Sequence, residues 1–590
     1  MKMKTGALAL LASCAACLAQ GSGSEDVVLR AMTDEMARAA AELRLEGLAR
    51  PYYIDTLVLE SDTYSGAAVF GGLARSRRTP SRSQGVHVRV GDYQLDNTNF
   101  SGGGGGRGAY DVYSLPLEDD YLVLRRHLWL STDEAYKAAV EALARKRAAL
   151  RNISLPVVLN DFARQDPVQA LGRRARLEID QKKWEERLRE WSAVFRRYPK
   201  ILSSRVEAEA SAGTRWFVNS EGMRVREPEV LYLVQAFATA QASDGMRIHD
   251  SVWIAARQEA GLGSPAEVRA RIDAMARRLS EFVSAGTLDT YSGPVLFEGM
   301  AAGQVFAEML GRNLALTRKP VSEGARGGLG PAAGGLGGAL DGRRKSRILP
   351  EWIDVTDDAA QAEWKGRPLL GHYEVDLEGV RPRRVELIRR GVLENFLLTR
   401  LPVKGFEGSN GHARLPGASG TWLAAPGNLL VTARETRPEA ELKKQLIEMC
   451  RAQDREFGLI VRKLDFPSSA SREDLVNIFS GQGQDERPTS IPLAVYKVYA
   501  ADGREEPVRG LRFHGFSMRN LKDIIAAGDE PHVFDFIDSG SAFALMEGSY
   551  GAETSVVAPS VLMDDVELKG SEEQRPRLPV APHPYFARQK

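Results

Sequence analysis

Histidines are the first residues to consider for chemistry, because imidazole is a frequent general base and metal ligand in proteins. The chain contains eight of them: His87, His127, His249, His372, His412, His514, His532 and His583. No two lie within one helical turn or one hairpin turn of each other, and neither a His-Glu-x-x-His motif nor an Asp-x-Asp calcium loop occurs. The sequence therefore holds no metal site built from neighbouring residues.

A metal site assembled by folding from distant residues is the alternative. His372 and Glu374 are two positions apart, so in a strand both side chains would point to the same face. With His412 they form the alternative ligand set, with zinc as the metal. The competing interpretation is an ordinary surface pair on a strand. No Gly-x-Ser-x-Gly nucleophile elbow occurs either, so the residues alone do not reveal catalysis.

The elements that must position these residues are helices and mostly antiparallel strands. Residues 264–267 (Ser-Pro-Ala-Glu) predict a capped helix start, and residues 131–134 predict another before Tyr136. Strand alternation and turn signals predict hairpins over residues 384–393 and 493–513. Because strand–helix alternation at βαβ spacing is missing, we expect an α+β fold.

The first residues have the order of a secretion signal. Two lysines lie within residues 1–4, an apolar run follows over residues 7–12, and small residues continue to Ala19. The run is too short to span a bilayer, so we expect a signal peptide over residues 1–19 and a periplasmic or secreted mature protein. In the alternative, the Leu-Ala-Ser-Cys sequence ending at Cys14 resembles a bacterial lipobox, and a lipid on Cys14 would hold the protein at a membrane. We favour release after Ala19.

Composition restricts the partners and the redox chemistry. The chain has 79 Lys and Arg against 78 Asp and Glu, so it lacks the concentrated positive charge that nucleic-acid binding needs. Its 590 residues, 43% of them hydrophobic, are enough for two or three cores. Cys14 and Cys17 lie in the expected signal, which leaves Cys450 as a single thiol. Because Cys450 follows Leu442 and Leu446 on the apolar face of a predicted helix, we expect it to be buried.

Several short segments follow one another in an order that is typical of one family. Residues 85–91 read Gly-Val-His-Val-Arg-Val-Gly, and residues 292–297 read Ser-Gly-Pro-Val-Leu-Phe. Further segments lie at residues 355–358, 377–380, 391–397 and 502–512. In this order they resemble the TldD/PmbA family, whose active members are zinc peptidases that act on small or unfolded peptides. The resemblance implies an α+β fold with a mixed α/β N-terminal region and a β-rich C-terminal domain.

The chain departs from this family at the helix that binds the metal. Active members carry His-Glu-x-x-x-His there. Aligned on the glycine before the second histidine, the motif positions are Gly299, Met300 and Gln304. Glycine has no side-chain donor and glutamine is a poor zinc ligand, so the resemblance implies a degenerate motif.

Neither another alignment nor the downstream segment restores the ligands. Aligned on Glu298 instead, the two histidines become Phe297 and Ala302. Active members also have a cysteine ligand far downstream, and residues 478–484, which correspond to it, contain none. Glu298 alone could act as a base, but a polar residue near a helix start is the ordinary interpretation.

We therefore expect an exported TldD/PmbA-like metallopeptidase homologue that has neither zinc nor catalysis and acts as a PmbA-like structural or substrate-holding subunit. Its partner would be an exported, metal-bearing TldD-like paralogue or a second copy of itself, and peptides are the expected ligands. Two alternatives stay open: an active zinc peptidase with ligands assembled from distant residues, and a stand-alone periplasmic peptide-binding protein. Whether the chain is an enzyme is left open.

The expected division of the chain follows from the same resemblance. After the signal peptide, residues 28–200 form an N-terminal domain with a helical insertion, and residues 201–290 form a middle region. Residues 291–590 form the β-rich C-terminal domain. Two glycine-rich tracts, at residues 101–108 and 324–342, are interpreted as surface loops; the first lacks the Lys-Ser/Thr of a phosphate-binding loop.

Overall fold

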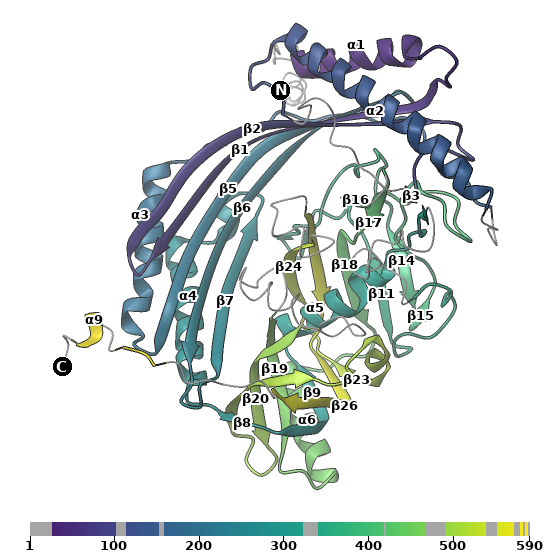
Figure 1. Ribbon diagram of the computed structural model, residues 1–590. Helices are drawn as coiled ribbons and strands as arrows, with labels where there is room; N and C mark the ends of the chain where they lie inside the picture. Colours follow the sequence, from purple (N-terminus) through teal and green to yellow (C-terminus); the bar gives the residue numbers. More distant parts are fainter. Residues whose placement is uncertain are drawn as a thin grey trace, which may run out of the picture.

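Long paired strands form a curved sheet in the first half of the chain. The computed structural model describes residues 26–101, 114–152, 158–322, 340–417, 420–465, 490–538, 551–571, 579–581 and 584–587. The strands of this sheet are ordered β2-β1-β5-β6, and both β7 and β4 pair with β6 (Figure 1). Their bounds are β1 (Pro51–Val69), β2 (Gly72–Val90), β4 (Gln169–Leu171), β5 (Ile201–Asn219), β6 (Arg224–Gln241) and β7 (Arg247–Ala256).

Small side chains on the outer face of this sheet allow two helices to pack closely against it. Alternate residues of β5 and β6 are buried alanines: Ala208, Ala210, Ala212, Ala236, Ala238 and Ala240. Because strand side chains alternate between faces, these alanines share one face. The helices α3 (Gln181–Ala193) and α4 (Pro265–Phe282) pack there, and residues such as Trp184 and Met275 fill the core between them and the sheet.

The other end of the same face is covered by α1 (Val27–Glu42) and α2 (Tyr121–Leu150). The predicted helix start at residues 131–134 is wrong. Ser131 lies inside α2, where its hydroxyl donates to the His127 carbonyl at 3.0 Å, and Asp120 caps the helix instead. A helix-interior Ser is tolerated because this bond satisfies its hydroxyl. The second predicted start is confirmed, since Ser264 and Glu267 form a capping box on α4.

The second half of the chain is rich in strands, as predicted. One sheet includes β26-β9-β19-β20-β21, and another includes β15-β14-β11-β18-β25-β24. The longer strands are β9 (Thr290–Phe297), β11 (Ile353–Asp357), β14 (Val385–Arg389), β18 (Asn428–Ala433), β19 (Phe457–Asp465), β20 (Ile491–Tyr499), β21 (Glu505–Arg509), β24 (His532–Asp538), β25 (Ala552–Ala558) and β26 (Val561–Gly570). The predicted hairpins correspond to β14 with β15 and to β20 with β21.

Shorter elements complete the second half and the connections. They are β3 (Phe100–Ser101), β8 (Gly286–Thr287), β10 (Val321–Ser322), β12 (Glu363–Trp364), β13 (Arg367–Pro368), β15 (Val392–Leu393), β16 (Ala413–Pro416), β17 (Trp422–Ala424), β22 (Leu511–Phe513), β23 (Ile524–Ala527), α9 (Pro584–Ala587) and the 3-10 helices η1 (Val194–Arg197), η2 (Glu259–Leu262), η4 (Arg312–Leu314) and η6 (Met518–Asp523). A π-helical turn at Ala307–Gly311 follows α5.

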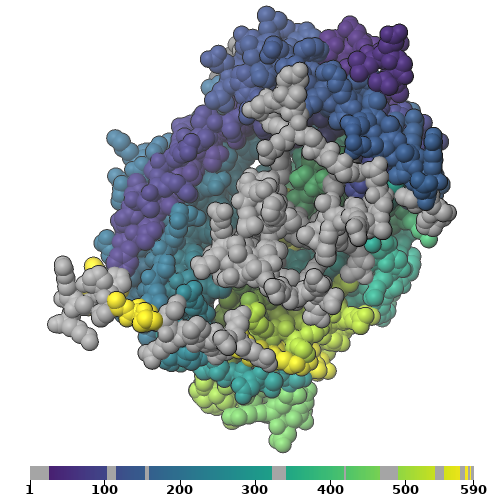
Figure 2. Space-filling view, in the orientation of Figure 1, coloured from purple at the N-terminus to yellow at the C-terminus, as the bar shows by residue number. Residues whose placement is uncertain are grey.

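Helices α5 (Met300–Phe306) and α6 (Glu439–Ala452) lie against the strands of the second half. Helix α5 contacts β19 of one sheet and β24 and β25 of the other, so it lies between the two sheets. Helix α6 buries Cys450 completely together with Leu442 and Leu446, as predicted. In the space-filling view, the N-terminal elements border the C-terminal strands along one side of the molecule (Figure 2).

The boundaries expected from the sequence, at residues 200 and 291, can be compared with the elements of the structure. Residue 200 lies within one structural unit, because β1 pairs along its length with β5. Residue 291 lies one position after the start of β9. The signal peptide over residues 1–19 and almost all of both glycine-rich tracts lie outside the described residues. Within the described residues, no helix is long and apolar enough to cross a membrane.

Candidate functional site

The segment between β9 and α5 makes a sharp turn at the predicted motif. The Glu298 amide donates to the Val461 carbonyl at 2.9 Å, and the Gly299 amide donates to the Ser560 hydroxyl at 2.8 Å. Gly299 has φ +58° and ψ −116°, a backbone conformation that strongly favours glycine. Gly299 is thus the residue that lets the chain pass from the strand into the helix.

Gln304 is a buried link between α5 and β19. It is 1% exposed. Its amide nitrogen donates to the Leu464 carbonyl at 3.1 Å, and its amide oxygen accepts from the Leu464 backbone nitrogen at 2.8 Å. Both ends of the amide are therefore engaged with a single backbone residue. Met300, by contrast, is 48% exposed.

His532 of β24 and Glu439 of α6 lie beside Gly299. A Cβ atom at Gly299 would lie 3.8 Å from the His532 ring, and His532 Nε2 is 3.9 Å from Glu439 Oε1. Burial raises the pKa of Glu439. An imidazole is thus present near the first motif position, but it comes from a different strand. Among the described residues, no three His, Cys, Asp or Glu side chains are grouped so that they could hold a metal ion.

Glu298 is committed to an ion-pair network on the surface. Its carboxylate accepts from Arg462, which also pairs with Glu505 at 2.8 Å, and Glu505 pairs with Lys443 at 2.7 Å. These carboxylates raise the pKa of the Arg462 guanidinium. One carboxylate oxygen of Glu298, Oε2, is held by the guanidinium, which supports the ordinary interpretation of a polar residue near a helix start.

The structure does not bring the alternative ligands together into one metal site. His412 is fully buried; its Nε2 is 3.0 Å from Asp357 Oδ1 and its Nδ1 is 2.9 Å from Asn410 Oδ1. With both ring nitrogens bonded, His412 has no atom left for a metal. The expectation that His372 and Glu374 share a strand is wrong, because a turn-rich segment without regular strand structure contains them.

The reason for this difference is a set of contacts with the first half of the chain. Arg257 donates to the His372 carbonyl at 3.0 Å, and the Glu374 amide donates to Glu227 at 3.0 Å. The ring Nδ1 of His372 lies 2.9 Å from the Ala359 carbonyl, and Glu374 is exposed. These backbone contacts with β6 and with the end of β7 replace strand pairing.

Comparison with known proteins identifies the fold. Residues 290–570 match the PmbA/TldA metallopeptidase C-terminal domain. The crystal structure of TldE from Thermococcus kodakarensis is 12% identical, covers 92% of this chain and 100% of its own, and has a TM-score of 0.54. A proposed modulator of DNA gyrase from Thermotoga maritima is 14% identical, with 88% and 96% covered and a TM-score of 0.55. No curated protein sequence matches the chain.

Through this C-terminal domain, the chain belongs to the TldD/PmbA family. The predicted resemblance is thereby confirmed, and so is the β-rich C-terminal domain, which coincides with the matched residues. The identities of 12% and 14% show a shared fold and carry no activity over to this TldD/PmbA protein.

The residues present do not fit the zinc that the family implies. In this TldD/PmbA protein, Gly299 has no side chain, Met300 is 48% exposed and offers only a thioether, and the amide of Gln304 is already bonded at both ends. Zinc in proteins takes thiolate, imidazole or carboxylate ligands. The segment at residues 478–484 that corresponds to the family's cysteine lies outside the described residues, as does Cys14.

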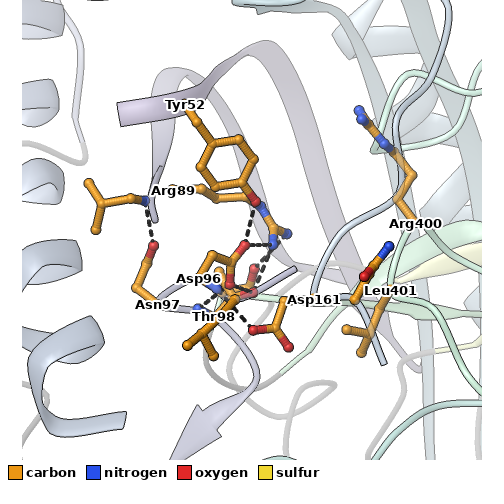
Figure 3. A network of polar contacts seen from close by, with 12 residues as sticks. Tyr52, Arg89, Asp96, Asn97, Thr98, Asp161, Arg400 and Leu401 are labelled. Atoms are coloured by element: carbon orange, nitrogen blue, oxygen red, sulfur yellow. Dashed lines mark hydrogen bonds and ion pairs between the residues drawn. The ribbon is translucent and has the colours of Figure 1, made fainter. Parts of the chain in front are cut away.

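A buried polar network in the first half of this TldD/PmbA protein reaches the second half through Arg89, which lies 3.5 Å from the Gly420 carbonyl. On β2, the Arg89 guanidinium bonds Asp96 and Thr98 at 2.8 and 2.7 Å, and the Tyr52 hydroxyl donates to Asp96 at 2.6 Å (Figure 3). The Arg89 charge is the main cause that holds the pKa of Asp96 down against the effect of its burial. Asp161 accepts from the Asp96 amide at 3.0 Å, which ties a second segment to the same cluster.

The Phe162 ring packs between two guanidinium groups that come from different halves of the chain. Its ring lies 3.7 Å from the guanidinium carbon of Arg89 and 3.9 Å from that of Arg400. Arg400 is fully buried and donates to the Ala163 carbonyl and to Glu221. Cation–π contacts of this kind are strongest when water is excluded.

Two buried carboxyl groups, those of Asp376 and Glu378, lie near Arg400. Burial raises the pKa of Glu378 to about 7, with the Asp376 charge contributing, and burial raises that of Asp376 to about 6. Glu378 accepts from the Arg400 amide at 2.5 Å, and Asp376 accepts from the Val380 and Ala413 amides at 2.8 and 3.0 Å. The bonds hold a tight turn against the N-terminal half.

An Asp–His pair escaped the sequence analysis. Asp55 of β1 and His87 of β2 are direct cross-strand partners, and His87 Nδ1 lies 2.8 Å from Asp55 Oδ1. Trp422 packs edge-on against the imidazole, with ring centroids 5.7 Å apart. The Asp55 charge and hydrogen bond raise the pKa of His87 even though its burial acts the other way. Alternation in the sequence marks β1 and β2 as strands. It predicts the pairing of Asp55 with His87 only when the hairpin turn between the two strands is recognised as well.

Proposed function

We propose that this chain is an exported TldD/PmbA-family protein that has no zinc chemistry of its own and acts as a structural or substrate-holding subunit. The observation that carries the proposal is the use of Gln304. Its amide, at the position of the second zinc-binding histidine, is bonded at both ends to the Leu464 backbone and is 1% exposed. The side chain at this motif position is therefore part of the buried core.

A substrate-holding role is supported by the inner face of the curved sheet. The residues that alternate with the buried alanines point away from α3 and α4 and include Glu207, Glu209 and Gln235. Glu209 is exposed, and Glu207 and Gln235 are half-buried. Leu231, Leu233 and Phe237 lie on the same face. A sheet face with both polar and apolar side chains offers hydrogen bonds and apolar contacts to an extended peptide.

Export is part of the proposal and rests on the sequence of the first residues. A positively charged start, an apolar run over residues 7–12 and small residues up to Ala19 support a cleaved signal. A metal-bearing partner, a TldD-like paralogue with an intact His-Glu-x-x-x-His motif, would then have to be exported as well. Lipidation of Cys14 is the alternative outcome, and intact mass of the mature protein separates the two.

The test combines metal content with partner capture. The mature chain, purified without added chelator, is measured for zinc by elemental analysis and is then incubated with the exported paralogue. We expect zinc well below one equivalent, no peptide hydrolysis by the chain alone, and co-elution with the paralogue on size exclusion.

Three results would point elsewhere. One equivalent of zinc that is lost in His372→Ala or His412→Ala would establish the active-peptidase alternative; Glu374→Gln serves as the third variant. A monomer that binds peptide and associates with nothing would establish a stand-alone binding protein. Co-elution of two copies of this chain alone would replace the paralogue by self-association.

A further inference from the structure

A cavity of about 360 Å³ opens on the far side of the curved sheet from α5. It lies where α3, η2 and the first turn of α4 meet. Figure 1 shows α3 and α4 along the sheet. Pockets of roughly 300–1,000 Å³ accommodate small ligands, and this one is at the lower end of that range. Its size suits a molecule no larger than an amino acid or a dipeptide.

The floor of the cavity is apolar and rigid. Trp191, Leu262 and Val268 line it and are 2%, 4% and 1% exposed. The Trp191 indole nitrogen donates to the Pro265 carbonyl at 3.0 Å, which fixes the ring in place. An aliphatic or aromatic side chain can rest on this floor.

One ion pair lies among these apolar residues. Arg187 Nη1 donates to Glu259 Oε1 at 2.7 Å, and the two side chains are 14% and 38% exposed. The Arg187 guanidinium also lies 5.3 Å from the Trp184 ring, and its buried Nε has no hydrogen-bond partner. Arginine has five N–H donors, and the described structure gives this one a single acceptor, the Glu259 carboxylate.

The ion pair selects ligands by charge. A ligand with only a carboxylate would be attracted by Arg187 and repelled by Glu259. A ligand with only an ammonium would be attracted by Glu259 and repelled by Arg187. A zwitterion satisfies both: its carboxylate accepts from the free donors of Arg187, and its ammonium donates to Glu259. In an α-amino acid both groups are attached to one carbon, so they lie side by side as the paired guanidinium and carboxylate do.

We propose that this cavity binds a free α-amino acid with an apolar side chain, held by Arg187 and Glu259 at its charged end and by Trp191, Leu262 and Val268 at its side chain. The site is separate from the proposed function, because the sheet lies between it and α5. Its presence or absence therefore leaves the subunit proposal unaffected.

The test is isothermal titration of the full mature chain with L-leucine. Glycine, N-acetyl-L-leucine and L-leucinamide probe the side chain, the ammonium and the carboxylate in turn. We expect saturable binding of one leucine per chain and roughly 10-fold or greater loss for each of the other three ligands.

Three variants place the binding in this cavity. Arg187→Met removes the charge that binds the carboxylate, and Ala260→Leu fills the mouth of the cavity from an exposed position without changing the charges. Both are expected to weaken leucine binding about 10-fold or more. Arg189→Gln, on the same helix and 44% exposed, is the matched control and should bind as the unaltered chain does.

The proposal is overturned if leucine shows no saturable binding to folded protein, or if Ala260→Leu binds it unchanged. It is equally overturned if N-acetyl-L-leucine and L-leucinamide both bind as tightly as leucine, because the ion pair would then select nothing. Tighter binding of leucyl-leucine than of leucine would replace the amino acid by a dipeptide and contradict the assignment of ligand size.

Discussion

The side-chain amide of Gln304 and the backbone of Leu464 form a closed pair of hydrogen bonds, at 3.1 and 2.8 Å, which fastens α5 to β19. In active relatives the same helix position would offer an imidazole to a metal. Here it satisfies two backbone groups that would otherwise be buried without partners. The link makes α5 a structural element of the core between two sheets.

Gln304→His is expected to destabilise the fold without restoring zinc. An imidazole cannot accept and donate at the two points that the amide reaches, so at least one Leu464 backbone group loses its partner. We expect the free energy of unfolding to fall by about 2–4 kcal/mol, measured by urea denaturation. Gln94→His, at an exposed position, is the control and should change it by less than about 0.5 kcal/mol. Unchanged stability together with stoichiometric zinc would contradict this reasoning.

Phe162→Leu is expected to weaken the junction between the two halves. The substitution removes the ring that Arg89 and Arg400 approach at 3.7 and 3.9 Å, and it leaves a void at a position that is 2% exposed. Loss of packing and of two cation–π contacts should lower the free energy of unfolding by about 2–4 kcal/mol. Trp129→Leu, at a position that is 46% exposed, provides the comparison and should be nearly neutral. A small effect at Phe162 would mean that the guanidinium groups find equivalent partners.

Glu378→Gln is expected to change how stability depends on pH. Burial raises the pKa of Glu378 from 4.5 to about 7, so between these values the folded chain holds a proton that the unfolded chain releases. This contribution is fully present below about pH 4.5 and is lost as the pH rises to about 7. The glutamine variant should therefore match the unaltered chain near pH 4.5 and exceed it at pH 8 by about 3 kcal/mol.

Denaturation curves at several pH values test this difference. The amide oxygen of glutamine can still accept from the Arg400 backbone nitrogen, so the geometry is retained. Glu374→Gln, which alters an exposed carboxylate in the same segment, is the control and should give parallel curves. A Glu378→Gln variant that is less stable at pH 8 would show that the carboxylate is ionised and needed in the folded chain.

Cys450 is expected to resist thiol reagents in the folded protein. It is fully buried on α6, and burial raises the pKa of its thiol, which lowers the fraction of reactive thiolate. A chain that starts after Ala19 should react with Ellman's reagent only as fast as it unfolds, and at once in denaturant. Rapid labelling of the native chain at neutral pH would show that α6 opens locally.

Periodicity predicted local structure where the pattern was long and uninterrupted. The capping box at Ser264 and Glu267, the apolar stripe around Cys450 and the two hairpins of the second half are confirmed. The start predicted at Ser131 failed because α2 extends over thirty residues and a cap-like pattern recurs inside it. A short sequence motif does not reveal whether a helix has already begun.

The sequence predicted which residues occupy the candidate site, but it did not predict which other residues surround them. The alignment located Gly299, Met300 and Gln304, but nothing in the sequence indicates that Gln304 would bond to Leu464 or that His532 would lie beside Gly299, since each contact joins segments more than 150 residues apart. The histidine and glutamate considered as ligands failed to share a strand because Arg257 and Glu227, from the other half of the chain, hold their backbone.

Strand β9, which leads into α5, pairs on one side with β19 and on the other with β26, the last long strand among the described residues. Its edge is therefore uncovered until residues 561–570 have been synthesised. During synthesis, an apolar strand that includes Val295, Leu296 and Phe297 would lie open to pairing with other chains. The sheet of the second half therefore cannot be completed before β26 is available, and a chain truncated before β26 is expected to aggregate and to need chaperone protection.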